Sequence, residues 1–103
     1  MTNNVGVNDP NDFDNLSDEQ KEILVKWIPH NLGRADRVYK KASSYYLKEL
    51  FEKSPQGFYI SNGQFKGAML AAEYRVFDKK ALNWHFGISK LFLERLEKRL
   101  ERS

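Results

Sequence analysis

The stretch GFYISNGQFKGAML, residues 57–70, changes its periodicity in the middle. Phe58, Tyr59 and Ile60 favour β-structure, so the stretch begins as a short strand that must pair with another strand elsewhere. Ser61 and Gln64 then have the spacing of a capping box, which predicts a helix from Asn62 onward. The chain is therefore expected to pass from an extended to a helical conformation across one capping residue.

The predicted helix from Asn62 to Glu73 has two different faces. Its apolar stripe consists of Phe65, Ala68, Met69 and Ala72. Elsewhere on the helix, Gly63 and Gly67 leave backbone bare, although each glycine costs a helix about 1 kcal/mol relative to alanine. We therefore expect a neighbouring helix or a ligand to approach the backbone closely there.

Two more helices are predicted before this stretch. Ser17 and Gln20 form a second capping box, and the helix that follows should end at Pro29, whose ring bars helical geometry at the preceding residue. Ser43 or Ser44 can cap another helix, which ends before Pro55. The segment between them, residues 30–42, is the most basic part of the chain and is expected to be a loop, either solvated or in contact with phosphate.

A β-hairpin and a last helix are predicted after this stretch. Val76 and Phe77 precede a polar turn at residues 78–80, and Leu82, Trp84 and Phe86 alternate with polar residues after it. Gly87 is expected to break the second strand, and Ser89 to cap the helix. That helix carries a stripe of Leu93, Leu96 and Leu100, which either folds back on the core or forms a homodimer contact.

The predicted order is helix, basic loop, helix, short strand, helix, hairpin, helix. A three-helix core closed by a hairpin, with a third strand between the second and third helices, is the arrangement of a winged helix-turn-helix, an α+β fold. We expect a disordered acidic tail over residues 1–16, a winged-helix-like domain over 17–88 and an amphipathic helix over 89–103.

In this fold the helix that begins at Asn62 is the recognition helix, whose first residues reach base edges in the DNA major groove. Asn62 and Gln64 can each bond adenine, and Lys66 can reach guanine. The predicted phosphate contacts are Arg34, Arg37, Lys40, Lys41, Arg75, Lys79 and Lys80. The sequence thus predicts a nucleic-acid interface, with duplex DNA as the expected partner.

The charge distribution agrees with a polyanionic partner. Residues 1–22 carry a net charge of −5, whereas the rest of the chain carries +8, within a total of +3. A basic body of this kind attracts nucleic acid. The aromatic residues give a second way to bind it, because Tyr45, Tyr46, Phe58, Tyr59 and Trp84 could stack on single-stranded bases. Tyr45 and Tyr59 stand out, since both fall off the apolar stripes.

Residues 43–86 resemble a stretch found in small accessory proteins of phages and integrated mobile elements. The resemblance is carried by Ser44-Tyr45 with Leu47-Lys48, by residues 57–70, and by Asn83-Trp84. It covers less than half of the chain and brings no catalytic signature. It implies a protein that acts on host or phage DNA, or on host proteins that defend against phage.

Several kinds of chemistry are not expected. The chain has no cysteine, and His30 and His85 have no partner at metal-ligand spacing, so no metal or other cofactor is predicted. No combination of acid, base and nucleophile indicates catalysis, and an enzyme is not expected. No apolar run reaches the roughly 20 residues of a membrane span, and no signal peptide is present, so the predicted location is cytoplasmic.

Two functions therefore remain open. The first is a non-enzymatic regulator that binds DNA. The second is an inhibitor that binds a host protein, such as a nuclease of antiphage defence. In the second case the acidic residues 1–22 could imitate nucleic-acid phosphates, or could lie against the basic face of the protein itself.

Overall fold

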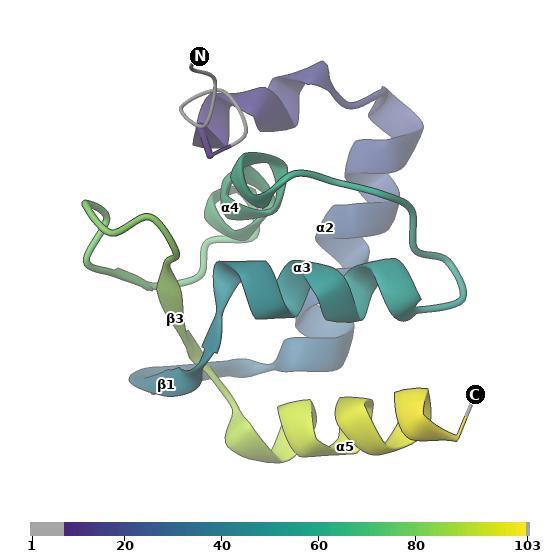
Figure 1. Cartoon of the computed structure of the whole chain (residues 1–103), viewed down its shortest axis with the longest axis vertical. Coiled ribbons are helices and arrows are strands. Elements are labelled where there is room, and N and C mark those ends of the chain that lie inside the picture. The colour runs from purple at the N-terminus through teal and green to yellow at the C-terminus, as the bar shows by residue number, and fades with distance from the viewer. Residues whose placement is uncertain (1–7, 103) are drawn as a thin grey trace.

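The chain forms a small α+β domain with its strands gathered at one side (Figure 1). A computed structural model describes residues 8–102. The elements are a 3-10 helix η1 (Pro10–Asn15), α2 (Asp18–Leu32), β1 (Arg34–Ser43), α3 (Ser44–Lys53), α4 (Asn62–Ala71), β2 (Val76–Phe77), β3 (His85–Ile88) and α5 (Lys90–Glu101). The three strands form one antiparallel sheet in the order β1-β3-β2.

The predicted helix starts are confirmed. Complete capping boxes open α2 at Ser17 and α4 at Ser61. Each serine hydroxyl accepts from the backbone N–H of the glutamine three residues on, and the side-chain oxygen of that glutamine accepts from the backbone N–H of the serine. Of the two serines offered for α3, Ser43 is the cap. Ser89 caps α5 as expected. These signals are local, so they fix where each helix begins without help from the rest of the fold.

The predicted end of α2 is wrong, because the helix continues through Pro29 to Leu32. Proline inside a helix removes one backbone hydrogen bond and costs about 3 kcal/mol. Here Pro29 lies on the exposed side, while Ile28 and Leu32 on the opposite side are completely buried. The burial of this last apolar turn offsets the cost, and the helix ends at Gly33, which has a positive φ of 60°.

The third strand lies elsewhere than predicted. Most of the segment 30–42, expected to be a loop, belongs to β1 and pairs with β3, whereas Phe58–Ile60 is not a strand. The Ile60 amide donates to the Glu52 carboxylate at 3.1 Å instead of to a neighbouring strand. Ile60 is still fully buried, so this extended segment packs into the core without joining the sheet.

The hairpin is confirmed, with Val76 opposite Phe86 and Phe77 opposite His85, but its connection spans residues 78–84. Gly87 was expected to break β3 and instead lies inside it. A Cβ at Gly87 would come within 2.1 Å of the Ala35 carbonyl oxygen on β1, so glycine permits the close approach of the two strands.

The core lies between α2, α3, α4, α5 and the sheet. Its largest fully buried side chains include Leu24, Ile28, Leu47, Phe51, Phe65, Met69, Phe86, Leu93 and Leu96. The leucine stripe of α5 thus faces the chain's own core, and only Leu100 is partly exposed. In this packing the stripe is not available for the homodimer contact that was the alternative.

Residues 8–16 are ordered and include η1, which corrects the expected disorder for this part of the N-terminal segment. Figure 1 shows η1 beside α4. Leu16 is only 8% exposed and Phe13 packs against the core, so two scattered apolar residues are enough to anchor the segment. Residues 1–7 lie outside the described part of the chain. Within residues 8–102, no helix is both long and apolar enough to cross a membrane.

Candidate nucleic-acid interface

Two of the three predicted base readers on α4 are buried. Asn62 is 6% exposed, and its side-chain amide donates to Asn8 Oδ1 at 2.8 Å and to Asn83 Oδ1 at 3.0 Å. Lys66 is 3% exposed, and its ammonium lies 4.8 Å from the ring centroid of Trp84. Burial lowers the pKa of Lys66 because it disfavours the charged ammonium. Neither side chain can reach a DNA base from this position.

The third reader, Gln64, is partly exposed but already engaged. Its side-chain oxygen accepts from the backbone N–H of Ser61 at 2.9 Å, and its backbone N–H donates to the Ser61 hydroxyl at 3.0 Å. Releasing Gln64 to a base would therefore open the capping box at the start of α4. The first turn of α4 as it stands presents no free reader.

The bare backbone of α4 is covered by the chain's own N-terminal segment. A Cβ at Gly63 would lie 2.3 Å from the Asp9 carbonyl oxygen, and one at Gly67 would lie 2.3 Å from the Pro10 carbonyl oxygen. The close approach expected from these glycines is confirmed: residues 8 and 9 make it at Gly63, and η1 makes it at Gly67. Only glycine at both positions lets η1 lie against α4.

The seven predicted phosphate contacts are all exposed, and they lie on strands or in the loops next to them. We call this set the basic sheet surface: Arg34, Arg37, Lys40 and Lys41 on β1, Arg75 just before β2, and Lys79 and Lys80 in the loop between β2 and β3. β1 and β2 are the two edge strands of the sheet. The cations therefore line both edges of the sheet and the tip of its hairpin.

Two arginines of the basic sheet surface are held by aromatic rings. The Arg34 guanidinium lies 5.0 Å from the Tyr74 ring centroid and donates to the Ala72 carbonyl. The Arg75 guanidinium lies 4.8 Å from the Phe77 ring and donates to the Asp36 carbonyl at 3.5 Å. Burial raises the pKa of Tyr74, although the charge of Arg34 acts in the opposite direction. Guanidinium groups fixed in this way lose little freedom when they bind phosphate.

Of the five aromatic residues considered for base stacking, only Tyr45 and Tyr59 are strongly exposed, at 49% and 79%. Trp84 is buried, and Phe58 packs edge to face on Phe51 at 5.0 Å. The Tyr46 hydroxyl donates to Glu97, and burial together with this bond raises the pKa of Tyr46 to about 12. The two residues that fall off the apolar stripes are thus the two with open ring surface.

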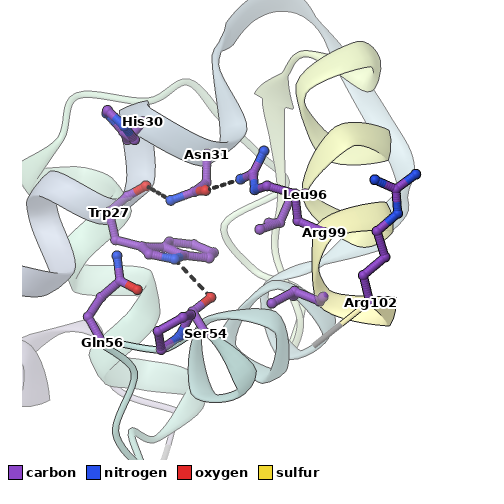
Figure 2. Close-up of a pocket in the computed structure, with 10 residues that line it drawn as sticks. Trp27, His30, Asn31, Ser54, Gln56, Leu96, Arg99 and Arg102 are labelled. Carbon is purple, nitrogen blue, oxygen red and sulfur yellow. Dashed lines mark hydrogen bonds between the residues drawn. The ribbon is translucent and has the colours of Figure 1, made fainter.

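A separate hollow of about 620 Å³, which sequence reasoning missed, lies between α2, α5 and the end of α3 (Figure 2). Dashed lines there link the Trp27 indole to Ser54 at 3.0 Å, the Asn31 amide to the Trp27 carbonyl at 2.9 Å, and Arg99 to Asn31. These polar groups bond one another across three helices. They hold α2, α3 and α5 together, and the pairing could not be read from residues so far apart in the sequence.

Within the part of the chain that the structure describes, no cluster of three or more histidine, aspartate or glutamate side chains could hold a metal ion. His30 is exposed near the end of α2, and His85 is half-buried on β3.

The geometry defines a small α+β domain with a basic sheet surface and a covered α4. Comparisons of the chain with models of known protein families, with curated proteins and with solved structures gave no match.

Proposed function

We propose that this chain is a winged-helix protein that binds nucleic acid, with duplex DNA as its target, and that it acts without catalysis as a regulator encoded by a phage or mobile element in the host cytoplasm. The order of elements supports the winged helix: α2, β1, α3, α4, β2, loop and β3, with the sheet arranged β1-β3-β2. In such a domain α4 is the recognition helix and residues 78–84 are the wing. The phage setting rests on the resemblance of residues 43–86.

The observation that carries this proposal is the exposure of all seven predicted phosphate-binding cations on the basic sheet surface. Cations on both sheet edges and on the wing can follow a phosphate backbone, and each contact releases counterions from DNA. Two of them, Arg34 and Arg75, already have fixed orientations. Binding through this surface is independent of base sequence, because phosphate contacts position a protein without reading bases.

Because η1 covers α4, this helix cannot recognise DNA bases in the conformation described. With η1 in place, Asn62 and Lys66 are buried and Gln64 is engaged in its capping box. We therefore propose two modes: phosphate binding through the basic sheet surface with η1 in place, and base readout by α4 after η1 has moved away.

The wing offers the direct test. Replacing Lys79 and Lys80 with alanine should lower the affinity for a labelled duplex and reduce the slope of log K against log salt by about 2, since each phosphate contact contributes about 0.9. Fluorescence anisotropy at several salt concentrations measures this slope. The matched control replaces Arg95 and Lys98, two exposed cations on α5, and should leave the slope nearly unchanged.

An unchanged slope in the Lys79, Lys80 variant would remove the wing from the interface. No duplex binding by the original chain even at low salt would favour the alternative function, an inhibitor of a host protein. That alternative is supported by the ordered conformation of this acidic segment, since η1 holds Asp12 and Asp14 in a defined position beside α4, where they could imitate phosphates to a nucleic-acid-binding partner.

A further inference from the structure

A pocket with open aromatic walls lies beside the covered start of α4. Its volume is about 620 Å³, and it is bounded by the first turns of α3 and α4, the residues just before α4, and the wing. Tyr45, Tyr59 and Leu82 line it and are 49%, 79% and 63% exposed. Large apolar side chains gathered on a surface in this way mark a binding site more often than single ones do.

A buried lysine orients the two tyrosines. The Lys48 ammonium lies 4.8 Å from the Tyr45 ring centroid and 5.4 Å from the Tyr59 ring centroid, and it is paired with Glu52 at 3.1 Å. Lys48 itself is only 6% exposed. The cation therefore contacts each ring from the protein side and leaves the outer surface of Tyr59 open. Rings held in advance lose little freedom when a flat ligand stacks on them.

Asn62, one of the residues that line the pocket, has a side-chain oxygen that lacks a hydrogen-bond donor. Asn62 Oδ1 is buried, and no donor within residues 8–102 reaches it. The orientation of this amide is set by the Leu82 carbonyl oxygen, which lies 3.3 Å from its nitrogen and cannot become a donor by a flip, as the side chains of Asn8 and Asn83 could. A reversed amide would place oxygen against oxygen. The pocket therefore suits a ligand that combines a flat apolar face with an N–H donor.

We propose that this pocket binds one unpaired nucleobase that carries an N–H donor, stacked on Tyr59 with its donor directed to Asn62 Oδ1. Because Oδ1 is buried, the base reaches it with a local opening of the pocket, while Leu82 and Asn83 of the wing accept from the Asn62 nitrogen and hold the amide in its orientation. The proposal deepens the proposed function, because it adds a single-strand site to a duplex-binding surface. Stacking of a base on an aromatic side chain tolerates any sequence, whereas the donor selects among bases.

The surrounding charge favours a nucleic acid over a peptide. Lys79 and Lys80 precede the pocket residues Leu82 and Asn83 in the wing, and Lys40 and Lys41 lie a few residues before Tyr45. The first turns of α3 and α4, which border the pocket, carry no carboxylate. Phosphates on either side of a bound base would thus meet cations without an acidic residue in these two turns to repel them.

The test uses an uncharged probe, so that it does not depend on the basic sheet surface. Adenosine is titrated into the full chain and followed by NMR, with purine riboside, which lacks the exocyclic amine, as the matched ligand. We expect saturable shifts at Tyr45, Tyr59, Asn62 and Asn83, and a Kd about fivefold or more weaker for purine riboside, from the loss of one hydrogen bond to a buried acceptor.

The matched protein variants address stacking. Tyr59→Ala should weaken adenosine binding by about fivefold or more, whereas Tyr59→Phe should retain it and Leu91→Ala, an exposed apolar residue on α5, should have no effect. Because Tyr59 is 79% exposed, these variants keep the fold. Equal affinity for the two nucleosides, or unchanged binding by Tyr59→Ala, would overturn the proposal.

Two further outcomes separate this inference from the proposed function. Adenosine binding without duplex binding would retain the pocket and remove the duplex-binding regulator. Conversely, if the pocket residues respond to an uncharged peptide such as acetyl-prolyl-leucinamide and not to adenosine, the pocket belongs to a protein ligand and the base-binding proposal falls.

Discussion

Lys66 is the residue at which the structure departs most from a simple reading of the helix. It follows the core residue Phe65 and was expected to face solvent, yet it is buried with its ammonium over Trp84 and its Nζ 3.4 Å from the Asn8 carbonyl oxygen. Helical spacing alone places Lys66 off the apolar stripe. The side chain is buried because η1 and the wing close over that face of α4, and both come from distant parts of the sequence.

The lowered pKa of Lys66 leads to a prediction about pH. Between the lowered pKa of the folded protein and the ordinary value of 10.5, the unfolded chain binds more protons at this site, so Lys66 makes the free energy of unfolding rise with pH. Lys66→Met lacks this group. Urea unfolding from pH 7 to pH 10.5 should show the original chain gaining stability relative to Lys66→Met as the pH rises.

Taking the difference between the two proteins cancels the titration of their shared groups, including Tyr46 and Tyr74. At neutral pH Lys66→Met should be at least as stable as the original chain, since methionine avoids the cost of burying a charge. A difference that stays constant with pH would show that the Lys66 ammonium is solvated in the folded protein. Lys53→Met, at an exposed lysine on α3, serves as the control for the loss of a surface lysine.

At the scale of elements, local signals in the sequence were sufficient for helices and insufficient for the sheet. The capping boxes at Ser17 and Ser61 act within four residues, so their helices could be predicted. β1 is rich in arginine and lysine and resembles a loop, because a strand at a sheet edge can expose most of its side chains. It becomes a strand only through its pairing with β3, about fifty residues later.

The sequence predicted that something contacts α4, but it did not identify η1 as the contacting segment. Gly63 and Gly67 predicted that something would lie against α4, but the segment that does so carries only Phe13 and Leu16 as apolar anchors. Such a sparse pattern is also typical of a disordered tail. The identity of the covering element, and with it the burial of Asn62 and Lys66, therefore needed the tertiary structure.

The same contact predicts an unusual effect of alanine. In an exposed helix, glycine to alanine stabilises by about 1 kcal/mol. At Gly67 the new Cβ would lie 2.3 Å from the Pro10 carbonyl oxygen and 2.4 Å from Phe13 Cβ, so Gly67→Ala should displace η1 while α4 remains helical. Hydrogen exchange should then become fast for residues 11–16 and stay slow in α4.

Leu70→Ala is the control, because Leu70 is on the exposed side of the same helix and should leave exchange in η1 unchanged. Slow exchange of residues 11–16 in Gly67→Ala would mean that η1 can shift by a few tenths of an ångström and still cover α4. If η1 still covers α4 in Gly67→Ala, the proposed function predicts that this variant binds duplex DNA no better than the original chain.

At the scale of the whole molecule, charge is separated in a way that bears on DNA binding. The basic sheet surface occupies the strands and the wing, whereas η1, which lies against the predicted recognition helix, carries Asp12 and Asp14. A duplex that approaches α4 from the side of η1 would come close to these two carboxylates. The N-terminal segment therefore opposes the docking of DNA on α4 in two ways, by occupying the helix and by repelling phosphate.

This separation predicts that stability and DNA affinity change in opposite directions when the segment is removed. Deleting residues 1–15 removes the packing of Phe13, which should lower the free energy of unfolding by about 1–3 kcal/mol. It also removes three carboxylates, raises the net charge from +3 to +6, and opens α4. Duplex affinity at physiological salt should then rise about tenfold, within the range of electrostatic effects on association.

A second variant separates the effect of the negative charge on η1 from the steric blocking of α4 by η1. Asp12→Asn with Asp14→Asn removes two of these carboxylates but leaves η1 on α4, since the Asp9 side chain that caps the 3-10 helix is retained. If η1 blocks α4 sterically, the deletion increases both the duplex affinity and the preference among duplex sequences. The aspartate variant then gains less affinity and no such preference. Equal gains would mean that η1 acts only through its charge, and that α4 does not read bases even when it is open.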